Sequence, residues 1–355
     1  MPNNRIFWID SIKFICIMFV MLSHLDSRTY VQYLFYDPFF LACFFFVSGY
    51  VYKPANTFKP FLYKKFRGLF VPWFVFSNIN IVLSHILSFN SHENIWKEFA
   101  LNLAQLRGYG DGVWFVAALF ISFIPFYFFI ELHSKSNNPH KSQRLIIISF
   151  ALSIASLIFT RYTNPTIFPW NEVVLPWHLE YIFHANFFMV LGYLYKIHDA
   201  DKIFFSLFRF PLFLIGWAVY LCAVYIPEYT HCSINEVFFF ILKYGRSFLG
   251  CLLIIGIAKR IPSNRYVAFI GQNTLIYFAF HGKCYSVLQT IANHFFYNQY
   301  QAILNNELYS SLFAIGLTIL LSLILIIPAI IINKYFYFVM GQKKPSRLDS
   351  VHKIC

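Results

Sequence analysis

Charged side chains are scarce in this sequence. Only 12% of its 355 residues are Asp, Glu, Lys or Arg, whereas 59% are hydrophobic, 22% are aromatic and the mean hydropathy is +0.58. A soluble domain with so few charges could not cover that much apolar material with polar surface. The composition therefore excludes an ordinary soluble fold and predicts an all-α, polytopic integral membrane protein.

Acidic residues are the scarcer of the two charge types. There are 15 Asp and Glu against 28 Lys and Arg, which gives a formal net charge of +13. Such an excess can indicate a nucleic-acid-binding protein, but here no basic cluster coincides with a nucleic-acid motif. Because the positive residues lie at the ends of apolar runs, we assign them to membrane topology and expect no nucleic-acid partner.

The cysteines do not show the spacing that is typical of a metal site or of a disulfide framework. The seven cysteines are scattered, mostly inside apolar runs, with no CxxC pair and no zinc-type His/Cys spacing. We therefore expect no metal. A cleavable signal peptide is not indicated either, because the first apolar run contains Asp10 and Lys13 and no small-residue cleavage site follows it. We interpret that run as a retained first span.

Apolar runs bounded by charged or proline-rich breaks predict about ten transmembrane helices. Of the 28 Lys and Arg, 21 lie on the side that holds both termini, so the positive-inside rule predicts that both termini are cytoplasmic. We expect one transmembrane domain over residues 1–340 and a basic cytoplasmic tail over residues 341–355. The expected spans are 6–25, 36–52, 69–88, 113–131, 144–160, 179–196, 209–226, 237–258, 267–293 and 309–333.

The segment from Asp10 to His24 carries three polar side chains inside an apolar run, and each is costly in hydrocarbon. Eleven helical steps bring Lys13 and His24 to within roughly 20° of one face, separated by a rise of about 16 Å. With Lys13 near one membrane surface, His24 would lie well inside the bilayer, and Asp10 is near enough to neutralise Lys13. A structural histidine and an Asp10/Lys13 topology anchor remain the alternatives.

Six segments stand out in order along nearly the whole chain: the stretch from Arg5 to His24, FFFVSGYVY (44–52), YKKFRGLFVPW (63–73), GVWFVAALF (112–120), NFFMVLGYLY (186–195) and FIGQNTLIYFAFH (269–281). Together they resemble the acyltransferase-3 family of integral membrane acyltransferases. The lysine form of the first segment is similar to the branch that includes fucose acetylase-like proteins.

The resemblance implies transfer of an acyl group, usually acetyl from acetyl-CoA, to a hydroxyl of a carbohydrate or glycolipid at a bacterial inner membrane. Acetyl-CoA is then a donor substrate, and no tightly bound cofactor is expected. His24 is the expected general base, because neutral imidazole can take the proton of a weakly nucleophilic hydroxyl, and burial would favour that neutral form. A covalent acyl-histidine intermediate stays open. Lys13 would orient the site or meet a donor phosphate, although lysine lacks the bidentate fork of arginine.

Three basic residues, Lys64, Lys65 and Arg67, match a family segment at the start of the third span, where they are expected to hold the donor's phosphates. A role in topology or in binding anionic lipid is the alternative. The nearby Ser48 and Gly49 lack the GxSxG elbow of a serine nucleophile, so we interpret them as a site of close helix packing.

Four residues are candidates for the acceptor site. They are Trp114, Lys243, Arg246 and His281. Lys243 and Arg246 lie three residues apart inside the eighth span and need a partner there, for which Glu180 and Glu236 are candidates. Structural roles stay open for all four: an interfacial tryptophan, an ion pair and a packed histidine.

A glycolipid transporter or flippase is the competing hypothesis. Ten spans, intramembrane charges and an aromatic surface favour it, but the lack of a detectable internal repeat counts against it. A family member without activity that acts as a partner or sensor is a third interpretation.

Overall fold

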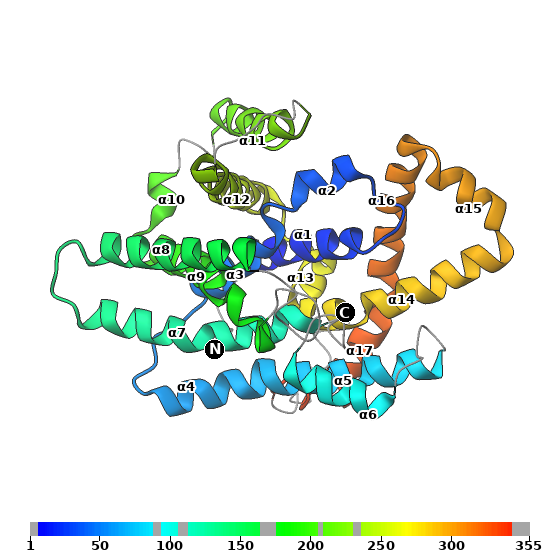
Figure 1. Cartoon of the computed structure of the whole chain (residues 1–355), viewed down its shortest axis with the longest axis horizontal. Coiled ribbons are helices and arrows are strands. Elements are labelled where there is room, and N and C mark those ends of the chain that lie inside the picture. The colour runs from blue at the N-terminus through cyan, green and yellow to red at the C-terminus, as the bar shows by residue number, and fades with distance from the viewer. Residues whose placement is uncertain are drawn as a thin grey trace.

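The protein is an assembly of helices in the computed structural model (Figure 1), which describes residues 6–87, 94–105, 113–163, 175–204, 209–229 and 236–342. Every regular element in these ranges is helical, so the predicted all-α class is confirmed there. In chain order the elements are α1 (Phe7–Ser23), α2 (Tyr30–Tyr36), α3 (Phe40–Tyr50), α4 (Phe58–Lys65), the π-helical turn η1 (Phe66–Phe70), α5 (Val71–Ile86), α6 (Ile95–Ala104), α7 (Trp114–Lys135), α8 (Lys141–Tyr162), the 3₁₀ segment η4 (Pro176–Tyr181), α9 (Ile182–Ile197), α10 (Ala200–Ile203), α11 (Leu212–Tyr229), α12 (Glu236–Arg260), α13 (Arg265–Gln272), α14 (Thr274–Phe295), α15 (Tyr297–Leu304), α16 (Glu307–Ile324) and α17 (Ile326–Tyr335).

Each predicted span overlaps at least one helix, but fewer helices meet the criteria for crossing a membrane. Within the described ranges, 6 helical stretches are long and apolar enough to do so. The count of about ten and the cytoplasmic termini therefore stay predictions, and residues 343–355 of the expected tail lie outside the described part. The 6 stretches are Tyr30–Tyr50, Phe58–Ile86, Trp114–Lys135, Lys141–Tyr162, Phe238–Arg260 and Glu307–Tyr335.

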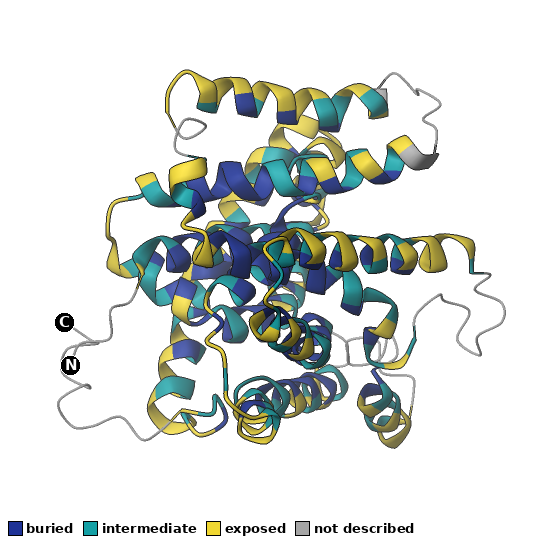
Figure 2. Cartoon of the chain, turned by 90° about the vertical axis from the view of Figure 1, so that its left-hand side faces the viewer, coloured by how far each residue is buried: buried dark blue, intermediate teal, exposed yellow. Residues whose placement is uncertain are grey.

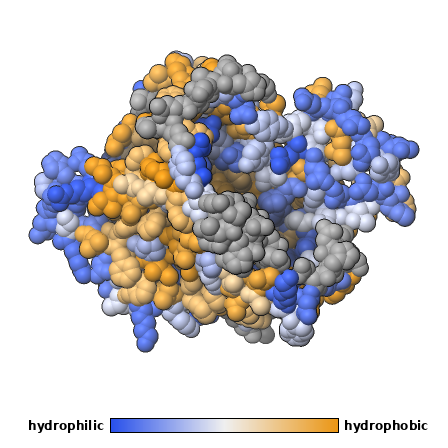
Figure 3. Space-filling model, in the orientation of Figure 1, coloured by the Kyte–Doolittle hydropathy of each residue, from blue (hydrophilic) through white to orange (hydrophobic). Residues whose placement is uncertain are grey.

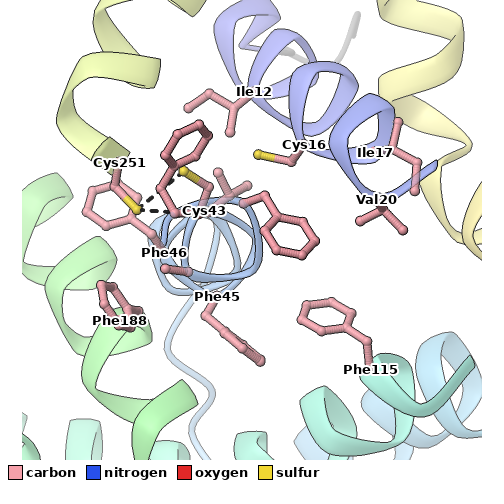
Figure 4. Close-up of a cluster of buried hydrophobic side chains, with 14 of the residues drawn as sticks. Ile12, Cys16, Ile17, Val20, Cys43, Phe45, Phe46, Phe115, Phe188 and Cys251 are labelled. Atoms are coloured by element: carbon pink, nitrogen blue, oxygen red, sulfur yellow. Dashed lines mark hydrogen bonds between the residues drawn. The ribbon is translucent and has the colours of Figure 1, made fainter. Parts of the chain in front are cut away.

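Helix α1 lies at the centre of the molecule, where it packs against α3, α12, α13, α14 and α16 (Figure 1). Its sequence contains neither glycine nor proline, so nothing interrupts the helix between Phe7 and Ser23. Cys16 of α1, Cys43 of α3 and Cys251 of α12 meet among phenylalanine rings, with the Cys43 and Cys251 sulfurs 3.3 Å apart (Figure 4). The core is thus built around the helix that carries His24.

Glycines let α3 and α9 approach closely. A Cβ on Gly49 would overlap the carbonyl of Met189, and a Cβ on Gly192 would overlap that of Phe46. The interpretation of Gly49 as a packing residue is therefore confirmed. Ser48 donates its hydroxyl to the Phe44 carbonyl at 2.8 Å.

Buried residues face inwards and exposed residues face outwards along the helices (Figure 2). Much of the exposed surface is apolar, including Ile147 and Ile148 on α8 and Leu312 and Ile319 on α16. Figure 3 shows an apolar expanse over the face formed by α7 and α8, with hydrophilic residues at the α7–α8 connection and around α15. An exposed apolar face of this kind suits a lipid environment.

Candidate active site

His24 lies directly after the last residue of α1. Its Nδ1 donates to the Val20 carbonyl at 2.8 Å and is 3.1 Å from the Ser23 hydroxyl. A carbonyl can only accept, so this hydrogen bond fixes the proton on Nδ1 and leaves Nε2 as the basic nitrogen. The expectation that His24 is buried is wrong: the residue is exposed, because α1 ends at Ser23 and His24 is already its C-cap.

His281 lies beside His24, with the ring centroids 4.7 Å apart and the rings inclined at 69°. It is buried in α14, and its Nδ1 donates to the carbonyls of Phe278 at 2.9 Å and Tyr277 at 3.1 Å. Its Nε2 has no hydrogen-bond partner in the described part of the chain. Both histidines therefore hold the proton on Nδ1 and present a basic Nε2.

A cavity of about 340 Å³ lies between α1, α3, α4, η1, α7 and α14. This volume is within the range of small-molecule binding sites. Basic residues lie on its wall at one end, and Ser48 and Thr274 are further polar members. The lining residues are Lys13, Ile17, Phe44, Ser48, Val51, Lys64, Lys65, Gly68, Leu69, Phe115, Val116, Leu119, Phe123, Thr274, Leu275 and Phe278.

Of the three basic residues in the 63–73 segment, two line the cavity and one does not. Lys64 and Lys65 line the cavity, and the Lys65 ammonium lies 3.4 Å from the ring centroid of Phe123. Arg67 is exposed and does not line the cavity; its guanidinium lies 6.0 Å from the Tyr63 ring. The π-helical turn η1, which follows Lys65 directly, places Gly68 and Leu69 on the cavity wall. Such turns recur at functional sites.

The cavity ends about one helical turn from the histidine pair. On α14, Phe278 lines the cavity and its ring lies 6.1 Å from that of His281. On α1, the lining residue Ile17 precedes by three residues the Val20 carbonyl that holds His24. A ligand whose polar end lies at Lys64 could therefore extend along the cavity towards both imidazoles.

Asp10 is buried, at 3% exposure, where α13 crosses α1. A Cβ on Gly271 would overlap the Asp10 carbonyl, so the glycine of the 269–281 segment permits this crossing. Lys13 lies three residues along α1, half-buried on the cavity wall. The pairing of Asp10 with Lys13 stays a prediction.

Trp114 begins α7 but lies off the cavity. Its ring contacts His178 at 5.1 Å and Tyr181 at 6.0 Å, while the neighbouring Phe115 lines the cavity. Phe278, whose ring lies 5.7 Å from that of Phe115, was not singled out from the sequence. Its position inside the family-like segment 269–281 was the available signal.

Lys243 and Arg246 lie half-buried on α12, away from the cavity. Glu180 is not their partner, because its carboxylate accepts the Leu175 N–H at 2.8 Å and lies 3.8 Å from Nδ1 of His178. The side chain of Glu236 is outside the described residues. The carboxylate that interacts electrostatically with Lys243 is Asp37, which follows α2.

The sequence model of the acyltransferase-3 family, described as an acyltransferase domain, matches residues 6–327. No curated protein and no solved structure matches the chain. The matched range includes the histidine pair and the basic residues of the cavity. Since this match spans nearly the whole chain, the protein belongs to the acyltransferase-3 family of membrane acyltransferases.

Proposed function

We propose that this protein transfers an acetyl group from acetyl-CoA to a hydroxyl of a carbohydrate or glycolipid. The observation that carries the proposal is the His24/His281 pair, which lies about one helical turn beyond a cavity whose wall carries Lys64 and Lys65. A single transmembrane domain over residues 1–340, in the bacterial inner membrane, would hold this site.

The basic end suits the donor. Lys13, Lys64 and Lys65 lie on the wall of one cavity, and ammonium groups form strong, charge-assisted hydrogen bonds with phosphates. Phosphates held near the exposed Lys64 would leave the flexible pantetheine arm to follow the apolar walls inward. Arg67 lies outside the wall, so we assign it at most a part in attracting the donor at the rim.

The histidine end suits the chemistry. His24 Nε2 removes the proton of the acceptor hydroxyl as its oxygen attacks the thioester carbonyl. A new C–O bond forms, the C–S bond breaks, and the protonated His24 returns its proton to the departing thiolate of CoA. His281, with its basic Nε2 unpartnered in the described structure, can accept a hydrogen bond from the acceptor hydroxyl or from protonated His24.

The geometry of the site also allows the two substrates to approach from opposite directions. Lys13 and His24 are separated by a helical rise of about 16 Å, so donor phosphates and acceptor hydroxyl can approach from opposite ends of the bundle. A cytosolic donor and an acceptor on the other side of the membrane could then meet at His24, which is exposed.

The test is transfer of label from radiolabelled acetyl-CoA into glycan by membranes that carry wild-type protein or His24→Gln at matched levels. Loss of a general base predicts a rate lower by a factor of about 10²–10⁴. His140→Gln is the matched control, because His140 is exposed between α7 and α8 and its imidazole bonds only Gln143 among the described side chains. Equal labelling by wild type and His24→Gln would exclude His24 as the base. Absence of labelling by wild type would favour the transporter hypothesis.

A further inference from the structure

A group of charged and aromatic residues beside His24 has no part in the chemistry described above. It comprises three cations, two tyrosines and one carboxylate contributed by α2, α12 and the segments next to α2. We call it the cation cluster, and its members are Arg28, Tyr33, Tyr36, Asp37, Lys243 and Arg246.

The packing of α12 determines which way the side chains of Lys243 and Arg246 face. A Cβ on Gly250 would lie 2.7 Å from the side chain of Phe39, so this face of α12 is pressed against the start of α3. Arg246 and Lys243 precede Gly250 by four and seven residues and therefore share its face. Since Asp37 precedes Phe39 by two residues, both cations are turned towards the connection between α2 and α3.

Three polar groups of the cluster lack partners in the described part of the chain. The Lys243 ammonium makes no hydrogen bond there and no ion pair within 4.0 Å, and the buried Nε of Arg246 has no acceptor. The Tyr36 hydroxyl is also unpartnered, on a side chain only 1% exposed. The Asp37 charge acts on both Lys243 and Tyr36. Buried donors are normally satisfied, and these three point to a ligand.

The charge balance favours an anion as that ligand. Two nearby carboxylates are already engaged: Glu180 accepts the Leu175 N–H, and Glu228 accepts the Tyr30 hydroxyl. Within the cluster itself, Asp37 is the one carboxylate and Lys243, Arg246 and Arg28 are three cations. A partly desolvated excess of positive charge attracts phosphates and carboxylates.

Arg28 connects this cluster to the histidine pair. Its Nε donates to the Ser23 carbonyl at 2.8 Å, next to His24, and its guanidinium lies 4.8 Å from the ring centroid of Tyr33. Tyr33 in turn lies 5.8 Å from the ring of Tyr36. A molecule held by the cluster would therefore lie close to the basic nitrogen of His24.

We propose that the cation cluster binds an anionic group of the acyl acceptor, a phosphate or a carboxylate, while the acceptor hydroxyl reaches His24. The inference rests on the proposed acyl transfer. The donor's phosphates have their own site at Lys64 and Lys65, on the other side of the histidine pair along α1. The acceptor is then an acidic glycan or a sugar linked through phosphate, rather than a neutral sugar.

The charge of the product tests this directly. Glycan labelled from radiolabelled acetyl-CoA by wild-type membranes is applied to an anion exchanger, and retention of the label is the expected result. Mild acid cleavage of glycosyl phosphates then separates the two sources: label that becomes neutral indicates a phosphate, and label that stays anionic indicates an acidic sugar. Label that elutes wholly as neutral glycan would overturn the proposal.

Variants test the residues. Lys243→Gln with Arg246→Gln should raise the KM for extracted glycan acceptor at least about tenfold, with the KM for acetyl-CoA unchanged. The charge-conserving pair Lys243→Arg with Arg246→Lys should retain most of the affinity, which separates lost charge from misfolding. Lys202→Gln is the matched control, because Lys202 is exposed near the other end of α12 and pairs with Asp199. An unchanged acceptor KM in the first double variant would contradict the assignment.

A binding measurement tests the cation cluster independently of acyl transfer. Inorganic diphosphate, compared with sodium chloride at equal ionic strength, should raise the melting temperature of the purified full chain. The rise should be smaller in the Lys243→Gln, Arg246→Gln protein, whereas equal rises would overturn the site. If wild-type membranes transfer no label, the proposed function fails, and this comparison alone decides whether the cluster binds anions.

Discussion

The two imidazoles at the centre of the molecule differ in exposure but share one hydrogen-bonding arrangement. In each, Nδ1 donates to a carbonyl of the preceding helical turn, Val20 for His24 and Phe278 for His281. The backbone therefore selects the tautomer, and neither side chain needs a carboxylate to orient it. This arrangement leaves both Nε2 atoms available to hold or pass a proton.

At the same scale, His281→Gln should reduce acyl transfer by a factor of about 10–100, because the basic Nε2 of the ring beside His24 is lost. The Kd for acetyl-CoA should not change, since His281 does not line the cavity. His294→Gln is the matched control on the same helix, where His294 is exposed. The measurement is labelled acetyl transfer by both variants at equal protein levels, and equal rates would show that His281 is only a packing residue.

The basic run of α4 and η1 offers a second residue-scale prediction. Lys65→Ala should weaken acetyl-CoA binding about tenfold, because a charge-assisted contact on the cavity wall is lost. Arg67→Ala should change the Kd less than about threefold, as expected for an exposed charge. Isothermal titration of the purified variants with acetyl-CoA measures both, and the reverse order of effects would contradict the location of the donor site.

Residue spacing could predict part of this site. Helical periodicity relates Lys13 to the end of α1, which His24 directly follows. It does not separate Arg67 from Lys64, because residues three apart on a helix share a face, and the resemblance treated the basic run as one unit. The contact between His24 and His281 joins residues 257 positions apart, and no local pattern encodes such a pair.

At the scale of elements, α1 and α14 form the frame of the site. They run side by side in the same direction, so that Lys13 and Thr274 line the cavity while His24 and His281 meet beyond it. Asn80 of α5 adds an anchor, because its side-chain amide donates to the Ala279 carbonyl of α14 at 2.8 Å. The histidine pair thus depends on helix packing rather than on a loop.

Helix packing gives an element-scale prediction. Gly49→Leu should destabilise the protein by about 1–3 kcal/mol or more, because the added side chain has no space against the Met189 carbonyl of α9. Gly316→Ala is the matched control, since nothing lies near its added Cβ on exposed α16. Thermal unfolding in detergent should show a lower Tm for Gly49→Leu only. Equal Tm values would mean that α3 and α9 do not pack as described.

Hydrophobic runs predicted where helices occur better than they predicted where one helix ends and the next begins. The single predicted span 267–293 is two helices, α13 and α14, that meet at Asn273. The Asn273 side chain donates to the Phe269 carbonyl at 2.7 Å and accepts from Asn333 at 2.6 Å, so it terminates one helix and ties it to α17. Hydropathy does not register such a break, because a single asparagine barely changes the average over a span.

At the scale of the whole molecule, the apolar surface and the distribution of charge describe the protein's place in a membrane. Exposed aliphatic side chains cover α8 and α16, while Lys196, Lys202 and Lys259 gather at the end of the bundle away from Lys243. Composition could predict the membrane class and the family-like segments could predict the enzyme class. Neither could predict which helices enclose the cavity, because that depends on contacts between distant segments.

The orientation of the whole molecule can be tested with reporters. A fluorescent protein fused after Cys355 should fluoresce, because we expect the C-terminus in the cytoplasm, where the positive residues collect. Alkaline phosphatase fused at the same position should be inactive. The opposite pair of results would invert the topology and place the Lys64 end of the cavity away from cytosolic acetyl-CoA.

The measurement that tests the central claim most directly compares donor binding with a single turnover in purified full-length wild type and His24→Gln, in bilayer discs supplied with acetyl-CoA and extracted glycan. The account predicts that the two proteins bind acetyl-CoA with Kd values within about twofold, while the single-turnover rate of His24→Gln falls at least about 10²-fold. A His24→Gln protein that transfers acetyl at the wild-type rate, or that no longer binds acetyl-CoA, would contradict it.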